Sequence, residues 1–166
     1  MILTLCPITK ELSRLAFDCG HPQLNQFLRH YAYKNDQLSI GKTFLALSDS
    51  HQLAGYLCLS SAQIGAESLP QDQRKFLPRY PVPALRISKL AVDLSYQKKG
   101  VGSYLLKQAL QKTLQISQNV GIYAVLVDAI DPRAQSFYIK YGFIPFHHNP
   151  LCLFLPIKTI EEATRR

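Results

Sequence analysis

Cysteine is sparse in this sequence and never occurs in a close pair. The four cysteines stand far apart along 166 residues, at Cys6, Cys19, Cys58 and Cys152. A disulfide framework needs denser cysteines in a smaller chain, and a structural zinc site needs paired ligands. The five histidines also lack a spacing that indicates a metal site. We therefore expect reduced thiols and no bound metal.

Long hydrophobic runs are absent as well. The longest purely apolar stretch covers only residues 122–127, far short of the roughly 20 residues that a membrane-spanning helix needs. At the N-terminus no basic residue precedes the first apolar residues, and Pro7 interrupts them early. We therefore expect no signal peptide. Together these features predict a soluble, cytoplasmic protein without a membrane anchor.

Negative charge is scarce too. The chain has 19 basic and 11 acidic residues and a net charge of +8, although charged residues make up only 18% of it. Between Arg74 and Lys107, eight basic residues stand against one acidic residue, Asp93, which is a balance of +7 in 34 residues. Such concentrated charge favours a polyanionic partner, for example a nucleic acid, a phosphate-bearing cofactor or an acidic protein. For Arg74, Lys75 and Arg79 the alternative is that they form only a solvent-exposed basic loop without a partner.

The length of the chain and its hydrophobic patterning predict a single α/β (α+β) domain over residues 1–166. In the first half we expect a strand at residues 2–6 and a helix that begins at His21-Pro22. A hairpin of residues 43–47 and 53–60 should follow, and then a proline-rich loop around a short helix at 65–84. The apolar stripe expected for the first helix consists of Leu24, Phe27, Leu28, Tyr31 and Leu38.

The second half has clearer signals. We expect a strand at 85–92, an amphipathic helix at 101–117 and a fully buried strand at 122–127. Asp131-Pro132 should cap and start another helix, because an acceptor side chain followed by proline is a common helix start. This helix should stop at Gly142, and residues 143–146 and 151–155 should form the closing strands.

The most informative segment is Gln97-Lys98-Lys99-Gly100-Val101-Gly102-Ser103, between a strand end and a helix start. Its glycines allow the backbone to approach a ligand closely, and the amides of a helix start can bind an anion. An exposed glycine-bearing turn is the alternative. A Walker A loop is excluded for Gly41-Lys42-Thr43, because the required earlier glycine is Asp36, and Leu105 breaks the dinucleotide fingerprint.

This loop is one of several motifs by which the sequence resembles the GNAT acetyltransferases. The strand Leu85 to Val92 leads to Gln97-x-x-Gly100-x-Gly102, and Ser136-Phe137-Tyr138-x-x-Tyr141-Gly142-Phe143 follows. Further segments resemble TacT-like GNAT toxins of toxin–antitoxin pairs: Leu24-Asn25-Gln26-Phe27-Leu28, Lys34-Asn35, Leu90-Ala91-Val92-Asp93 and Leu153-Phe154-Leu155-Pro156. The resemblance covers about residues 20–157.

The resemblance implies a GNAT fold, with a central mixed and mostly antiparallel sheet flanked by helices, and acetyl-CoA as acetyl donor. It assigns the pantetheine arm to the backbone of Leu90, Ala91 and Val92, and the pyrophosphate to the loop Gln97, Lys98, Lys99, Gly100, Val101, Gly102 and Ser103. Asp131 and Ser136 should flank the arm, and the Tyr138 hydroxyl should protonate the departing thiolate. A tyrosine that only packs on the sheet is the alternative for Tyr138.

TacT-like toxins acetylate the α-amino group of aminoacyl-tRNA, and the residues themselves agree with such an acceptor. The strand 85–92 holds no acidic residue before Asp93, whereas a lysine acceptor, with a pKa near ~10.4, usually needs a positioned base. An α-amino group, with a pKa near ~7.7–8.0, is partly neutral already. The residues expected to bind the substrate are Lys34, Arg74, Lys75, Arg86 and Lys89.

The sequence departs from the family pattern at three cations. Lys42 and Lys89 stand where the family often has arginine, and Lys lacks the bidentate fork of Arg; Arg86 stands where an apolar residue is expected. By resemblance the partners would be aminoacyl-tRNA, a ribbon–helix–helix antitoxin and a second copy of the chain in a homodimer. Two other functions stay open, namely acetylation of a small-molecule or protein amine, and non-catalytic binding of CoA or an acidic partner.

Overall fold

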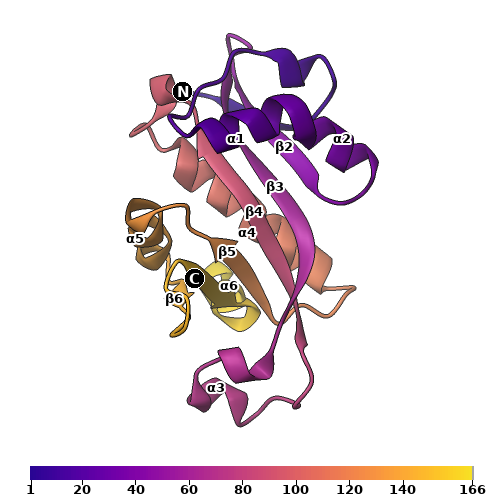
Figure 1. Ribbon diagram of the computed structural model, residues 1–166, viewed down its shortest axis with the longest axis vertical. Helices are drawn as coiled ribbons and strands as arrows, with labels where there is room; N and C mark the ends of the chain where they lie inside the picture. The colour runs from indigo at the N-terminus through magenta and orange to yellow at the C-terminus, as the bar shows by residue number, and fades with distance from the viewer. Residues whose placement is uncertain (166) are drawn as a thin grey trace. The chain divides into compact units, whose positions relative to one another are not determined.

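A computed structural model describes residues 1–165 as a seven-stranded sheet with helices (Figure 1). The strand order is β1-β2-β3-β4-β5-β7-β6, with β4 and β5 parallel and the pairs β1–β2, β2–β3, β5–β7 and β6–β7 antiparallel. This confirms the predicted fold class. The strands are β1 Leu3–Pro7, β2 Lys42–Ser48, β3 Leu53–Ile64, β4 Val82–Val92, β5 Ala124–Asp128, β6 Ile144–Pro145 and β7 Cys152–Pro156.

The chain divides into two compact units, which are described separately below. The first unit contains Met1–Ser60 and Ser88–Ala109, and the second contains Ser61–Ile87 and Leu110–Arg166. That residues 1–166 act as one domain stays a prediction. The α-helices are α1 Pro22–Gln26, α2 Ala32–Gln37, α3 Gln71–Arg74, α4 Val101–Ser117, α5 Pro132–Lys140 and α6 Ile157–Thr164.

In the first unit, α1 and α2 pack on the hairpin of β2 and β3. Leu28 and Ala32 are buried together with Leu45 and Tyr56, and the Tyr56 hydroxyl donates to the Leu24 carbonyl at 2.8 Å. A π-helical turn, Phe27–Tyr31, joins the two helices. Because a π turn inserts a residue into the helical repeat, the buried face moves from Tyr31 to Ala32, which is fully buried. The prediction was therefore wrong for Tyr31 and Leu38, which are exposed.

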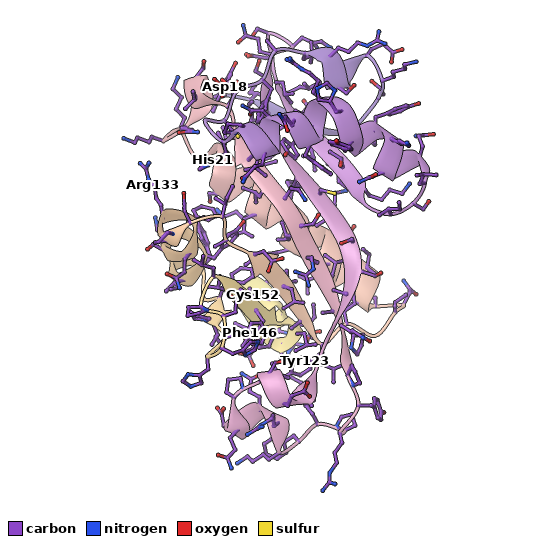
Figure 2. The ribbon with its side chains drawn as sticks, viewed as in Figure 1. Asp18, His21, Tyr123, Arg133, Phe146 and Cys152 are labelled. Atoms are coloured by element: carbon purple, nitrogen blue, oxygen red, sulfur yellow. The ribbon has the colours of Figure 1, made fainter. Side chains whose placement is uncertain are left out.

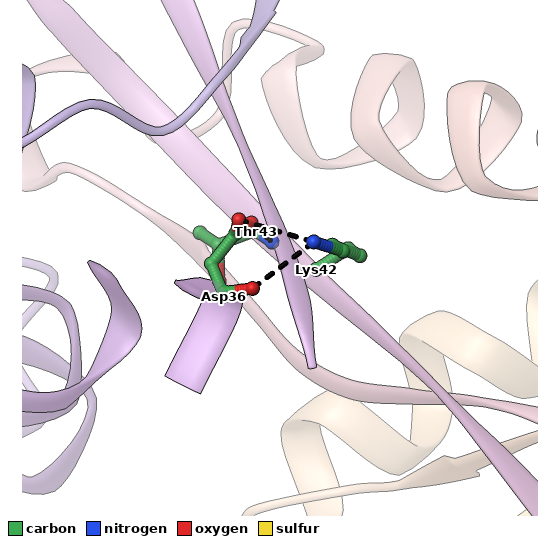
Figure 3. A network of polar contacts seen from close by, with 3 residues as sticks. All are labelled: Asp36, Lys42 and Thr43. Atoms are coloured by element: carbon green, nitrogen blue, oxygen red, sulfur yellow. Dashed lines mark hydrogen bonds and ion pairs between the residues drawn. The ribbon is translucent and has the colours of Figure 1, made fainter. Parts of the chain in front are cut away.

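The end of α2 is tied to the start of β2 by one carboxylate (Figure 3). Asp36 accepts a hydrogen bond from the Thr43 backbone amide at 3.0 Å and pairs with the Lys42 ammonium at 3.4 Å. The Lys42 ammonium also donates to the Asp36 carbonyl at 3.0 Å. Lys42 is thus engaged within the protein at a position where the resembled family often has arginine.

Helix α4 packs on the first unit through Val101, Leu105 and Leu106, which are almost fully buried. Beneath it, Gly55 leaves no room for a side chain. A Cβ at this position would lie 2.7 Å from the Ala91 carbonyl oxygen and 2.9 Å from Leu105 Cδ1. This close contact holds the start of α4 next to the end of β4.

The second unit has its own core around β5 and β7. Ala124, Leu126, Phe146 and Phe154 pack together there, with Phe146 and Phe154 ring centroids 4.9 Å apart. Helix α5 starts as predicted, because Asp131 accepts a hydrogen bond from the Ala134 amide at 2.8 Å and Pro132 follows it.

The predicted elements correspond closely to the observed ones in the second half of the chain, and α4 has the predicted bounds. Helix α6 was missed, because residues 157–164 follow Pro156 without a capping side chain. All four cysteines are free thiols. Over residues 1–165, every helix is too short or too polar to cross a membrane.

Candidate functional site

The first part of the site is the end of β4. This strand pairs in parallel with β5 from Ala84↔Ala124 to Ile87↔Val127 and then continues over residues 88–92. Leu90, Ala91 and Val92 therefore lie beyond the register shared with β5. A strand that outruns its neighbour offers backbone groups to an extended ligand, in the way that a peptide adds to a sheet edge.

The predicted anion loop follows directly in the same unit. Lys98 and Gly100 have φ angles of +63° and +86°, and α4 begins at Val101. Left-handed residues next to a helix start turn successive backbone amides toward one point, which creates an anion-binding nest. A Cβ on Gly100 would meet nothing within 4 Å, so no neighbouring group covers the loop at this residue. The loop residues thus fit a pyrophosphate group.

The Gln97 side chain is held by hydrogen bonds within the protein. Its carboxamide donates to the Val92 carbonyl at 3.0 Å and to the Cys19 carbonyl at 3.1 Å. The side chain therefore fixes the loop to the end of β4, and it would act on a ligand by positioning the loop. Lys98 and Lys99 are exposed, and the Lys99 ammonium lies 5.8 Å from the Tyr96 ring centroid.

Tyr138 belongs to the second unit, on α5. The side chain is 5% exposed, and its ring centroid lies 5.2 Å from that of Phe137 and 5.4 Å from that of Phe143. Burial, and to a smaller extent the negative charge of Asp128, raises the pKa of Tyr138. Its hydroxyl therefore keeps its proton at neutral pH and is available as a donor. Ser136, one position before Phe137, is exposed and donates to the Pro132 carbonyl at 3.1 Å.

A carboxylate that the sequence interpretation missed lies near Tyr138. Asp128 at the end of β5 is ion-paired with Arg86 of β4, and it accepts a hydrogen bond from the Cys152 thiol. Burial first, and then Asp128, raises the pKa of Cys152 to about 12. The strand 85–92 itself has no acidic residue before Asp93, but the parallel register with β5 supplies one beside Arg86. Asp128 thus supplies a carboxylate beside this strand, where none was expected.

A pocket of about 150 Å³ opens beside this cluster in the second unit. Figure 2 shows Phe146 and Cys152, two of its lining residues, close together. Its wall combines apolar groups with the Arg86 guanidinium and polar groups of the loop that follows β3. The lining includes Ile64, Ser68, Arg86, Leu126, Phe146 and Cys152.

The other predicted substrate residues are distributed over both units. In the first unit, Lys34 is exposed on α2, and the Lys89 ammonium lies 4.4 Å from the Phe27 ring centroid. In the second unit, Arg74 and Lys75 are exposed at the end of α3. The carboxylate of Asp128 explains why Arg86 is accommodated where an apolar residue was expected.

A mixed sheet with an overrunning central strand, followed by an anion loop at a helix start, is the framework of an acyl-group transferase. A profile of the GNAT acetyltransferase domain matches residues 39–145. The chain belongs to the GNAT acetyltransferase family, and it is an N-acetyltransferase.

Two curated relatives extend this similarity over most of the chain. A tRNA-acetylating toxin of Mycobacterium tuberculosis (strain ATCC 25618 / H37Rv) is 32% identical over 143 residues, which are 86% of this chain and 85% of that protein. A probable toxin TacT of Sinorhizobium fredii (strain NBRC 101917 / NGR234) is 31% identical over 158 residues, 90% of this chain and 87% of the relative.

Solved structures are similar over nearly the whole chain. A tyrosine-to-phenylalanine mutant of KacT has a TM-score of 0.90 at 31% identity and covers 97% of this chain and 98% of its own. AtaT in complex with acetyl-methionyl-tRNAfMet has a TM-score of 0.88 at 30% identity, with coverages of 98% and 99%. A mutant AtaT toxin bound to the C-terminus of the antitoxin AtaR and to acetyl-CoA has a TM-score of 0.81 at 27% identity, with full coverage of both chains.

Proposed function

We propose that this protein transfers the acetyl group of acetyl-CoA to the α-amino group of aminoacyl-tRNA and thereby acts as a toxin that blocks translation. The observation that carries the proposal is the similarity over 98% of the chain to AtaT in complex with acetyl-methionyl-tRNAfMet. The curated relative of M. tuberculosis, named a tRNA-acetylating toxin, supports the same substrate.

The donor site would be formed by the end of β4 and the start of α4. Backbone amides from Lys98 to Ser103 would bind the pyrophosphate, since the left-handed Lys98 and Gly100 give this segment the geometry of an anion nest. The backbone of residues 90–92 would hydrogen-bond the pantetheine arm as an added strand. Asp131, the N-cap of α5, and Ser136, within this helix, would flank the arm.

The chemistry would be direct transfer without an acetyl-enzyme. The neutral α-amine attacks the thioester carbonyl carbon, the C–S bond breaks, and the sulfur takes the Tyr138 hydroxyl proton. The proton lost by the amine passes to solvent or to Asp128, whose carboxylate lies close enough to Tyr138 to raise its pKa. Asp128 would also orient the amine by accepting a hydrogen bond from it.

The pocket beside Asp128 would hold the side chain of the acceptor amino acid. Its volume of about 150 Å³ matches that of protein cavities which bind a benzene-sized molecule. It therefore suits an amino-acid side chain of small or medium size. The pairing of Arg86 with Asp128 makes the rim of the pocket electrically neutral, which favours uncharged amino acids over charged ones.

The cationic residues at the surface would bind the RNA backbone. Lys34, Arg74, Lys75 and Lys89 would contact phosphates, whereas Arg86, already paired, would act at the rim of the pocket. By the same similarity, an antitoxin of the ribbon–helix–helix type would inhibit the protein, which would act in the cytoplasm as a homodimer.

A translation extract tests the function as a whole. The purified protein with acetyl-CoA should stop protein synthesis, and it should leave synthesis unchanged when acetyl-CoA is omitted. Tyr138→Phe serves as the matched inactive variant. If synthesis continues in the presence of both the protein and acetyl-CoA, the tRNA proposal is contradicted. The acetyltransferase assignment would remain.

A further inference from the structure

Two aromatic side chains stand far out of the second unit, in a segment rich in basic residues. Phe76 is 81% exposed and Tyr80 is 69% exposed. Between and beside them lie Arg74, Lys75 and Arg79, all exposed. We call residues 74–80 the aromatic loop. An exposed aromatic ring forgoes the favourable free energy that burial would contribute, so folding alone gives no reason for the position of these two rings.

The aromatic loop is held in place from behind. Leu77 packs against the core that contains Leu69 and Ile64, and its amide donates to the Arg74 carbonyl at 3.0 Å. The Tyr123 hydroxyl, just before β5, donates to the Gln73 carboxamide oxygen at 2.6 Å. The two exposed rings are therefore presented on an anchored segment.

The chemistry of the loop matches single-stranded nucleic acid. Aromatic side chains stack on unpaired bases, and neighbouring cations bind the phosphates between them. The Lys75 ammonium lies 5.0 Å from the Phe76 ring centroid, so a phosphate bound by Lys75 would bring its base to that ring. A duplex would offer phosphates but no base faces for Phe76 and Tyr80.

The residue that anchors the aromatic loop lies one strand length from Asp128. Tyr123 directly precedes β5 and Asp128 is its last residue, so five steps along the strand at about 3.3 Å each place them roughly 17 Å apart. Figure 2 shows Tyr123 near α3, with Cys152 and Phe146 further along the same unit. About four or five stacked nucleotides, at roughly 3.4 Å each, span this length. The 3′ end of tRNA carries unpaired nucleotides just before the aminoacyl ester.

We propose that Phe76 and Tyr80 stack on the unpaired bases at the 3′ end of the acceptor RNA, while Arg74, Lys75 and Arg79 bind the adjoining phosphates. This inference rests on the proposed function, because it assumes that the aminoacyl ester reacts beside Asp128 and measures the distance to the loop from there. Gly65 and Ser68 of the acceptor pocket belong to the same β3–β4 connection as the aromatic loop. One connection would thus hold both the amino acid and its nucleotides.

The test compares two acceptors, full-length aminoacyl-tRNA and aminoacyl-adenosine, which has a single nucleoside and no phosphate. The double variant Phe76→Ala, Tyr80→Ala should lower kcat/KM for aminoacyl-tRNA by at least about tenfold, because each stacked base contributes about five- to hundredfold. Its kcat/KM for aminoacyl-adenosine should stay unchanged. Both residues are exposed, so the variant should fold normally.

Matched variants separate stacking from hydrophobic contact and from charge. Phe76→Trp should keep the activity on aminoacyl-tRNA, whereas Phe76→Leu should lose it in part. Arg74→Ala, Lys75→Ala should reduce the salt dependence of tRNA binding, and the aromatic variants should weaken binding at unchanged salt dependence. Tyr31→Ala, an exposed aromatic residue of the first unit, is the control.

Two results would overturn the proposal. If the wild type and the double variant are equally active on aminoacyl-tRNA, the rings do not bind the RNA. If the double variant in addition changes its oligomeric state or its affinity for the antitoxin, the loop binds a protein partner instead. Equal losses on both acceptors would show an indirect effect on the site. If the wild-type protein acetylates neither acceptor, the proposed function itself has failed.

Discussion

Arg86 of β4 and Asp128 of β5 form an ion pair, although they lie 42 positions apart in the sequence. The pair connects the two parallel strands at the point where their shared register ends. Because Asp128 also contacts Cys152 and acts on Tyr138 electrostatically, it brings the acceptor pocket and the proposed acid into one cluster.

Asp128→Asn should slow acetyl transfer at neutral pH. Asp128 is proposed to orient the acceptor amine and to take its proton, and such a base contributes about a hundredfold or more to the rate. Tyr138 keeps its proton in both proteins, because burial is the larger cause of its raised pKa. kcat/KM should therefore fall about a hundredfold at pH 7.5, which steady-state kinetics measures.

The control for that experiment is Asp49→Asn, an exposed carboxylate in the turn between β2 and β3. The Arg86–Asp128 pair is partly exposed, so its loss should change the free energy of unfolding by less than about 1 kcal/mol. A kcat/KM of Asp128→Asn equal to that of the wild type would exclude a role for Asp128 in the reaction.

Tyr138→Phe should abolish turnover without weakening the donor complex. A general acid contributes about a hundred- to ten-thousandfold to the rate, and the aromatic ring that packs on Phe137 and Phe143 is retained. We expect kcat to fall by this factor at an unchanged Kd for acetyl-CoA, measured by calorimetry. Tyr31→Phe is the control. If Tyr138→Phe turns over as fast as the wild type, Tyr138 has no part in the mechanism.

Gly100→Ala should weaken acetyl-CoA binding through the backbone alone. The φ angle of +86° is unfavourable for alanine, while a Cβ there would meet no neighbour within 4 Å. A left-handed conformation costs about 1–2 kcal/mol, so the Kd should rise about five- to thirtyfold. Gly121→Ala, with a nearest Cβ contact of 3.9 Å to Pro83, is the matched control, and equal affinities of the two variants would contradict the anion nest.

Much of the fold followed from the sequence, because its signals are local. The Asp131-Pro132 start of α5 and the hydrophobic period of α4 each act within one element. The buried stripe after Leu28 could not be predicted, since the π turn changes the helical phase without a characteristic residue. Asp128 was missed for another reason: its neighbourhood depends on the register between β4 and β5, which no local pattern encodes.

Thr43→Val should stabilise the protein. The Thr43 side chain is 1% exposed, and within residues 1–165 its hydroxyl oxygen has no hydrogen-bond partner. Since an unpaired buried hydroxyl costs about 1–3 kcal/mol, valine should raise the free energy of unfolding by about 1 kcal/mol in urea titrations. The control Asp36→Ala removes the acceptor of the neighbouring Thr43 amide and should lower the free energy of unfolding. If Thr43→Val also lowers it, the hydroxyl is not an unpaired group that costs stability.

Alkaline pH should destabilise the fold through its buried tyrosines. Burial raises the pKa of Tyr56 and of Tyr138, so above about pH 10 the unfolded chain loses protons that the folded chain keeps. The contribution of these tyrosines to the free energy of unfolding is therefore fully present below about pH 10 and is lost as the pH rises further. Tyr56→Phe should make this decline shallower by up to about 1.4 kcal/mol per pH unit, in contrast to Tyr31→Phe. Equal slopes for both would be the contrary result.

Transfer of label tests the central claim most directly. The purified protein is incubated with acetyl-labelled acetyl-CoA and total aminoacylated tRNA, and the RNA is digested with nuclease and analysed by mass spectrometry. The account predicts labelled N-acetyl-aminoacyl-adenosine carrying an uncharged amino acid of small or medium size, and none with Tyr138→Phe. RNA that stays unlabelled while the protein binds acetyl-CoA would contradict the claim that aminoacyl-tRNA is the acceptor.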